Sequence, residues 1–220
     1  MIEDLAEAAG GEFVAIDVEG DGHNPPHPVE IAAILYRGGV AAEERRWLIN
    51  PGRPMTEFVQ ELHGITDAML ADAPHFAEVE EEVRSAITGR VLVAHAAKED
   101  LRMLRTAMPD ADFLPAAVID TQRLAKAMVP GLPRYRLEAV CEALGISPED
   151  GEGRWGFHSA PGDAAMAGLS FMKLAAMIPP SPKQRRHVAG MAQIRMSPQE
   201  EQRLREEMAA RTGSDGVFRP

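Results

Sequence analysis

The stretch Phe13-Val14-Ala15-Ile16-Asp17-Val18-Glu19-Gly20-Asp21-Gly22 determines how the rest of the chain is interpreted. Its alternation places the two valines and Ile16 on one face of a strand, and Asp17 and Glu19 together on the other. Two carboxylates side by side at the end of a buried strand repel each other, so both are stable as anions only beside a cation. The pattern alone also fits a strand-end ion pair or a solvated turn. The choice between these interpretations depends on what other segments bring to this strand end.

Composition limits the class of protein. The chain has 220 residues, of which 45% are hydrophobic, which is enough for a sizeable core. Its acidic start does not resemble a secretion signal, and no run approaches the roughly 18 apolar residues of a membrane span, so we expect a cytoplasmic protein with no membrane partner. The single cysteine, Cys141, lies among apolar residues at helical spacing, which favours a buried side chain over a nucleophile. The net charge of −11 argues against a general nucleic-acid binder, but not against a nuclease that holds metal ions through carboxylates.

The hydrophobic pattern predicts an α/β protein that begins with strands. Arg37-Gly38-Gly39 joins two β-rich runs, so those two strands are expected to form an antiparallel hairpin. The expected strands lie near residues 13–19, 29–36, 40–49, 91–94 and 117–120, and the expected helices near 55–62, 76–87, 98–108, 121–128, 136–144 and 164–178.

Further acids and a histidine follow at the ends of these elements. Asp100 comes shortly after the strand at 91–94, while His158 precedes the helix at 164–178 and Asp163 lies in its opening turn. The four acids, Asp17, Glu19, Asp100 and Asp163, form a set of oxygen ligands that suits Mg²⁺ or Mn²⁺ better than zinc. Two such ions about 3.5–4 Å apart are able to hold a scissile phosphate and activate a water. A histidine is suited to accept the proton of that water at neutral pH.

In this order the motifs resemble the DEDDh 3′–5′ exonucleases, over about residues 12–175. The first motif is Ile16-Asp17-Val18-Glu19, and the second runs from Val93-Ala94-His95 to Asp100-Leu101. The third is His158 followed five residues later by Asp163, the spacing of the histidine subtype. The supporting segments are Leu62-His63-Gly64-Ile65-Thr66-Asp67, Val118-Ile119-Asp120-Thr121, Arg136-Leu137-Glu138-Ala139 and Leu144-Gly145-Ile146.

The resemblance implies a ribonuclease H-like mixed five-stranded sheet, with its first three strands antiparallel and helices on both faces. It also implies that Asp17 bridges two Mg²⁺ or Mn²⁺ ions and that Glu19 and Asp163 complete the first site. Asp100 would act on the second ion mostly through water, and His158 would be the general base.

The resemblance also assigns a pocket for the 3′-terminal nucleotide to Gly20, His63 and Ile65. His95 begins the second motif and is interpreted as a structural residue rather than a catalytic one.

The chain departs from the family pattern at three places. Gly20-Asp21 stands where two threonines are usual, Ala96 replaces an asparagine, and Glu99 replaces a phenylalanine. We expect these changes to affect substrate binding before chemistry, with Glu99 opposing the incoming phosphates. The alternative is that Glu99 faces solvent on its helix and pairs with Arg102.

We expect an exonuclease domain at residues 1–179, followed by a C-terminal appendage at 180–220 that lies outside the resemblance and has a basic segment, a charged helix and a mobile end. The expected function is removal of nucleoside monophosphates from the 3′ end of single-stranded DNA or RNA. The alternative is a catalytically weak module of the same fold that binds nucleic acid or docks a partner. The intact acids favour the enzyme, whereas a polymerase partner or a homodimer is left open.

Overall fold

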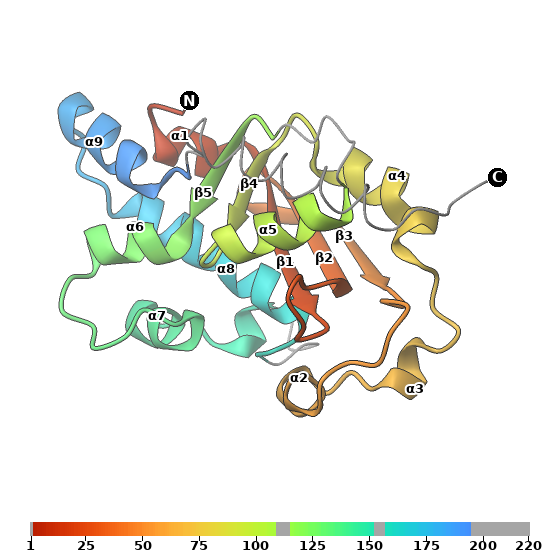
Figure 1. The fold of residues 1–220 in the computed structure, drawn as a ribbon. Coiled ribbons are helices and arrows are strands. Elements are labelled where there is room, and N and C mark those ends of the chain that lie inside the picture. The colour runs from red at the N-terminus through yellow and green to blue at the C-terminus, as the bar shows by residue number, and fades with distance from the viewer. Residues whose placement is uncertain (1, 109–114, 152–156, 195–220) are drawn as a thin grey trace.

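The structure is a computed structural model that describes residues 2–108, 115–151 and 157–194 (Figure 1). Its centre is one sheet with the strand order β3-β2-β1-β4-β5. β1 pairs antiparallel with β2, and β2 with β3, while β1, β4 and β5 run parallel. The predicted mixed sheet with three antiparallel leading strands is therefore confirmed. The strands are β1 (Glu12–Gly20), β2 (Pro28–Arg37), β3 (Val40–Leu48), β4 (Val91–Ala94) and β5 (Ala117–Asp120).

The hairpin between β2 and β3 forms at the predicted glycines. Gly38 and Gly39 have φ angles of 59° and 79°, the positive values that a two-residue turn matched to strand twist requires. The register of the neighbouring pair places Glu19 on β1 directly opposite Glu30 on β2. Residues directly opposite each other share one face of a sheet, so these two acids are neighbours.

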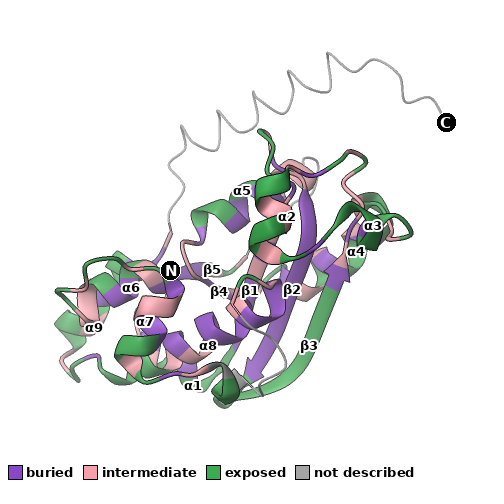
Figure 2. Ribbon diagram, turned by 90° about the horizontal axis from the view of Figure 1, so that it is seen from below, coloured by how far each residue is buried: buried purple, intermediate pink, exposed green. Residues whose placement is uncertain are grey.

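Helices cover both faces of the sheet, as expected, and Figure 2 shows β2 as buried, whereas the edge strand β3 is mostly exposed. On one face lie α1 (Leu5–Gly10), α6 (Thr121–Met128), α7 (Leu137–Leu144), α8 (Ala160–Ala176) and α9 (Pro182–Ala192). On the other lie α4 (Phe76–Ile87) and α5 (Lys98–Ala107). The short helices α2 (Glu57–His63) and α3 (Asp67–Leu70) pack around a small apolar cluster near the end of the sheet, and η1 (Pro148–Gly151) follows α7.

The α8 helix packs closely on the sheet because a glycine faces it. A Cβ on Gly168 would lie only 2.6 Å from the ring of Tyr36, a distance that real side chains do not show. The Tyr36 ring stacks on Phe13 at 4.8 Å between centroids, and Phe13 meets Phe171 edge-on at 5.1 Å. This close contact fixes the position of α8 relative to β1 and β2, and the first turn of α8 carries Asp163.

Part of the segment that we assigned to an appendage packs against the domain. Val188, Ala189 and Ala192 of α9 are buried in the same core as α8, and the backbone N–H of Ile194 donates to the Val118 carbonyl at 2.9 Å. A domain boundary at residue 180 stays a prediction, and the charged helix and chain end expected beyond it lie outside the described residues. Among the described helices, none has the length and apolar character needed to cross a membrane.

Candidate active site

Three of the predicted acids converge where β1 ends and α8 begins. Carboxylate oxygens of Asp17, Glu19 and Asp163 all lie within 4.8 Å of one another. Asp17 and Glu19 share a face because they are two residues apart on β1, and Asp163 reaches them from the first turn of α8. The strand end and the helix start, far apart in sequence, therefore form one site.

These carboxyl groups hold their protons more tightly than free acids do. Burial raises the pKa of Glu19 to about 7, with Asp163 and Glu30 adding to the effect. Burial also raises the pKa of Asp163 to about 6, although the neighbouring His158 acts to lower it. The pKa of Asp17 is raised well above its usual value, first by burial and then by the surrounding acids. Such mutual destabilisation of anions is what a bound cation relieves.

Asp100 joins this set from α5. Its Oδ1 accepts a hydrogen bond from the backbone N–H of Val18 at 3.0 Å, between the two acids of β1. Burial raises the pKa of Asp100 to about 8, and Glu19 adds to this, while the Val18 N–H opposes it. One oxygen of Asp100 thus supports the strand, which leaves the other for a ligand.

The four carboxylates of the site are suitable ligands for divalent cations. Asp163 Oδ1 is buried with no hydrogen-bond partner, an arrangement that natural proteins avoid unless something else occupies the position. All four groups offer carboxylate oxygens, the ligands that Mg²⁺ and Mn²⁺ prefer. Asp17, Glu19, Asp100 and Asp163 are therefore the residues that would hold such ions.

His158 lies at the rim of the site and not within it. Its side chain is exposed, and its Nε2 is 3.5 Å from Glu138 Oε1 on α7. Its φ of 64° is in the left-handed region, where few residues other than glycine are found. Ser159 follows as the N-cap of α8, so the turn that carries His158 leads directly into the turn that carries Asp163.

The residues predicted to bind the terminal nucleotide lie together but differ in exposure. His63 Nδ1 accepts from the Ile65 N–H at 3.0 Å, and its Nε2 is buried without a well-formed hydrogen bond. Burial lowers the pKa of His63, which the nearby Gly20 backbone opposes. The Ile65 side chain is only 3% exposed and packs in a small apolar cluster. Their role in substrate binding stays a prediction.

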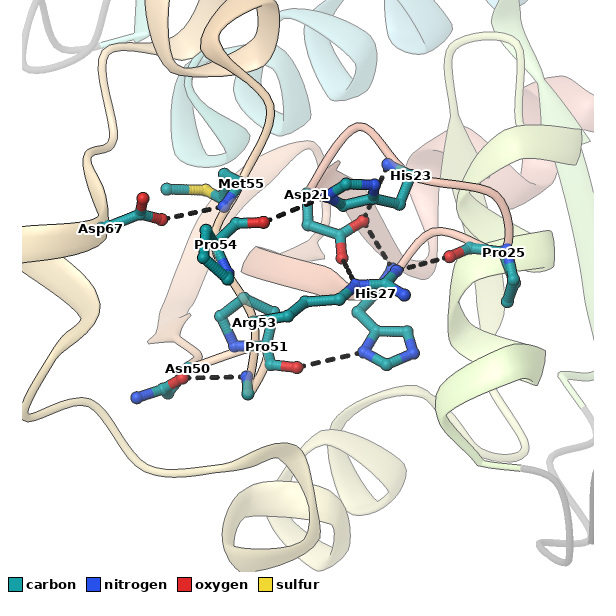
Figure 3. Close-up of polar contacts among 11 residues, drawn as sticks. Asp21, His23, Pro25, His27, Asn50, Pro51, Arg53, Pro54, Met55 and Asp67 are labelled. Carbon is teal, nitrogen blue, oxygen red and sulfur yellow. Dashed lines mark hydrogen bonds and ion pairs between the residues drawn. The ribbon is translucent and has the colours of Figure 1, made fainter. Parts of the chain in front are cut away.

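Asp21, which departs from the family pattern, is a structural residue. It is fully buried, and its Oδ2 accepts from Arg53 Nε at 2.6 Å (Figure 3). Its Oδ1 accepts from the backbone N–H groups of His23 and His27 at 3.1 and 3.0 Å. These bonds close the loop after β1 onto the turn at residues 50–54, so the charge of Asp21 is neutralised within the fold.

The altered second motif has a local explanation at each position. Ala96 has a φ of 58°, and its N–H donates to Asp120 Oδ1 at 3.2 Å. Glu99 is exposed and paired with Arg102 at 3.0 Å, the arrangement that we gave as the alternative. His95 has both ring nitrogens in hydrogen bonds, one with Thr121 Oγ1 and one with a backbone carbonyl, so it is placed as a structural residue.

The residue that sequence reasoning missed is Glu30. It is fully buried on β2, opposite Glu19, and it bonds to Arg46 on β3 and to the backbone of Ala160 on α8. The available signal was a glutamate within the apolar run of residues 29–36. A charge inside a strand that is buried on both faces needs a partner.

Comparison with known proteins gives the family. A family model described as exonuclease, RNase_T, matches residues 14–171. The DNA polymerase III subunit epsilon of Aquifex aeolicus is 29% identical over 168 residues, which cover 74% of this chain and 80% of that protein. A DNA polymerase III subunit epsilon-like protein of Rhodobacter capsulatus is 36% identical over 169 residues, and the 3′-5′ exonuclease DinG of Bacillus subtilis is 32% identical over 167. This chain spans 23% and 17% of the length of those last two proteins.

Solved structures share the fold. Exonuclease X in complex with 5′ overhanging duplex DNA matches with a TM-score of 0.64 and 24% identity, over 81% of this chain and 99% of that one. The nuclease domain of 3′hExo, a DEDDh family member bound to rAMP, matches with a TM-score of 0.59 and 13% identity, over 72% and 88% of the two chains. The family model covers well over half of the chain and spans every acid of the site, so the protein belongs to the exonuclease family to which its motifs pointed.

Proposed function

We propose that this chain is a metal-dependent 3′–5′ exonuclease that removes nucleoside monophosphates from the 3′ end of single-stranded DNA or RNA. The observation that carries the proposal is the convergence of Asp17, Glu19 and Asp163 within 4.8 Å, with Asp100 bonded to the strand between the first two. In a member of the exonuclease family, a structural use for this many buried, mutually repelling acids is hard to justify, because they reduce the stability of the fold unless a cation joins them.

In the proposed reaction each residue has a separate task. Divalent ions bound to the four carboxylates would offset the charge of the scissile phosphate and lower the pKa of a water. Asp17, Glu19 and Asp163 hold their oxygens toward a common centre, and Asp100 contributes from α5. His158, at the exposed rim, accepts a proton from the attacking water and passes it to solvent. Gly20, which follows Glu19, and His63, which contacts the Gly20 backbone, would hold the terminal nucleotide.

His158 contacts α7 in the structure. Its Nε2 lies 3.5 Å from Glu138 Oε1, and in the proposed reaction this nitrogen exchanges that contact for the attacking water. Catalytic hydrogen bonds are often long or misaligned in the absence of substrate, which is consistent with this role.

The direction and substrate class are tested on one oligonucleotide labelled at either end, as DNA and as RNA, with Mn²⁺ or with a chelator. Release of labelled mononucleotide from the 3′ label as the first product, with a ladder of shortened strands from the 5′ label, is the expected result. Internal cleavage, or shortening from the 5′ end, would contradict the proposal. No turnover of either nucleic acid with Mn²⁺ would favour the alternative of a binding module.

A further inference from the structure

Glu30 connects three elements around the site without offering a free oxygen to it. Both its bonded contacts are short: Oε1 accepts from Nε and from a terminal nitrogen of Arg46 at 2.6 and 2.5 Å, and Oε2 accepts from the Ala160 backbone N–H at 2.8 Å. The Glu30 side chain is 1% exposed, so these bonds are shielded from water. Both oxygens of Glu30 are engaged in these bonds, and Glu30 is not among the acids whose oxygens lie within 4.8 Å of one another, so we assign it a supporting position beside the cluster.

The bond to Ala160 completes the N-terminus of α8. The first N–H groups of a helix have no partner within the helix and need one from elsewhere. The Gly162 N–H donates to Ser159 Oγ at 3.3 Å, and the Asp163 N–H to the Ser159 carbonyl at 2.9 Å. The second helical residue is Pro161, which has no N–H. The remaining donor, on Ala160, is bonded by a carboxylate from a distant strand.

This contact holds a turn whose backbone is strained. His158, two residues before Ala160, has a φ of 64°, a conformation that costs free energy for a residue other than glycine. An ionised acceptor makes a hydrogen bond roughly twice as strong as a neutral one, and a negative charge at a helix N-terminus is favourable. The Glu30 carboxylate therefore stabilises a turn that its local sequence alone does not favour.

The pairing of β1 with β2 connects the Glu30–Ala160 hydrogen bond to the catalytic acids. Glu30 lies directly opposite Glu19, so a bond from Glu30 to the first turn of α8 sets the distance between that turn and the end of β1. The distance between Asp163 and Glu19 depends on the same two elements. The Arg46 guanidinium, which bonds the other oxygen of Glu30, offsets the added negative charge beside the cluster.

We propose that Glu30 is a positioning residue, which holds the first turn of α8 in register with the acids of β1. The inference rests on the proposed exonuclease activity for its kinetic consequence, but the anchoring itself is independent of that activity. A misplacement of catalytic groups by about 1 Å is able to cost about 10²-fold in rate, so the loss should fall on kcat.

The test uses Glu30→Ala, the double variant Glu30→Gln/Arg46→Gln, and Tyr36→Phe as a matched control. The control removes a hydroxyl on the same strand that reaches the Ala165 carbonyl of the same helix at 3.5 Å, away from its first turn. Steady-state kinetics on a short 5′-labelled strand with Mn²⁺ gives kcat and KM. Hydrogen–deuterium exchange of a peptide covering residues 158–165 reports on the helix start, and residues 166–176 serve as the internal reference.

For Glu30→Ala we expect kcat to fall by about 10- to 100-fold with KM within about twofold of the parent, and exchange to accelerate only at residues 158–165. The double variant retains a neutral, weaker acceptor for the Ala160 N–H without a buried charge, so kcat and exchange should recover most of the way from the Glu30→Ala values toward those of the parent. Tyr36→Phe should leave kcat unchanged. If Glu30→Ala does not fold, the double variant, judged against Arg46→Gln alone, carries the test.

Parental exchange at residues 158–165 in Glu30→Ala would overturn the proposal. A loss of kcat that the double variant does not restore would overturn it as well, because the charge and not the contact would then be what matters. A parent chain that is inactive on every strand would contradict the proposed function instead, while the exchange measurement would still decide whether Glu30 anchors α8.

Discussion

Asp100 Oδ1 accepts a hydrogen bond from the backbone N–H of Val18 at 3.0 Å, so the acid from α5 is attached to the strand between Asp17 and Glu19. On β1, only residues 14 and 15 pair with β4. Beyond this pairing, the backbone N–H of Val18 has no strand partner on the β4 side and donates to the Asp100 side chain instead. Asp100 therefore holds the end of β1 in place while its charge acts on Asp17 and Glu19. The proposed ligand role would combine with this structural role in one carboxylate.

Substitution of Asp17 in β1 and of Asp21 in the loop after it should change stability in opposite directions. In the absence of metal at pH 8, Asp17→Asn should leave the free energy of unfolding unchanged or raise it, because it relieves repulsion in a buried cluster. Asp21→Asn should lower it by about 2–4 kcal/mol, because Arg53 loses its anionic partner. Urea denaturation of both variants and of Asp72→Asn, an exposed loop control, measures the difference. A loss of stability in metal-free Asp17→Asn would contradict this account of the cluster.

Metal-free stability should decline as pH rises from about 4 to about 8. Burial raises the pKa values of Glu19 and Asp100 to about 7 and 8, so the folded chain retains protons that the unfolded chain has already released. The unfolded state binds fewer protons throughout this range, and the free energy of unfolding therefore falls with pH. For Glu19, whose pKa rises from an ordinary 4.5 to about 7, the decrease is on the order of 3 kcal/mol. Mn²⁺ should reverse this trend, because it binds the ionised acids. Thermal melts between pH 4 and pH 8, with and without Mn²⁺, measure the effect, and a metal-free melting temperature that does not change with pH would contradict the prediction.

His158→Asn should lower kcat by about 10²- to 10⁴-fold at neutral pH while substrate binding is retained. Asparagine tolerates the left-handed backbone at this position, so the variant removes the base with little change to the turn. The loss should shrink as pH rises, because hydroxide replaces the missing base. A pH–rate profile parallel to that of the parent would assign proton acceptance to another group.

Ala96→Asn should raise the free energy of unfolding by about 0.5–1 kcal/mol, because Ala96 has a φ of 58° and asparagine occupies this region more readily. Ala96→Gly is the matched variant, since it relieves the same backbone strain without adding an amide. If both variants gain stability and only the asparagine lowers KM, the amide contacts substrate. Unchanged or lower stability in both would show that the backbone at this turn is not strained.

The elements of the fold could be predicted because their signals are local. The alternation in β1, the Gly38-Gly39 turn and the spacing of His158 and Asp163 each depend on a few neighbouring residues, and each is found where it was expected. The convergence of Asp17, Glu19 and Asp163 also followed, because the resemblance supplied the arrangement of the elements that carry them.

The partners of single buried charges could not be predicted, because they lie far away in the chain. Asp21 pairs with Arg53, and Glu30 bonds to a backbone amide 130 residues later. Local periodicity gives the face on which a residue lies but not the group that meets it there. For the same reason the sequence did not indicate that small apolar residues of α9 join the core beside α6.

The most direct test of the central claim is the rate at which Asp17→Asn shortens a 5′-labelled single strand at saturating Mn²⁺, relative to the parent. Asp17 belongs to the acid cluster, and we expect its substitution to leave the fold intact, so the predicted rate is that of the chelator-treated parent. A rate for Asp17→Asn equal to that of the parent would contradict the assignment of this cluster as the catalytic metal site.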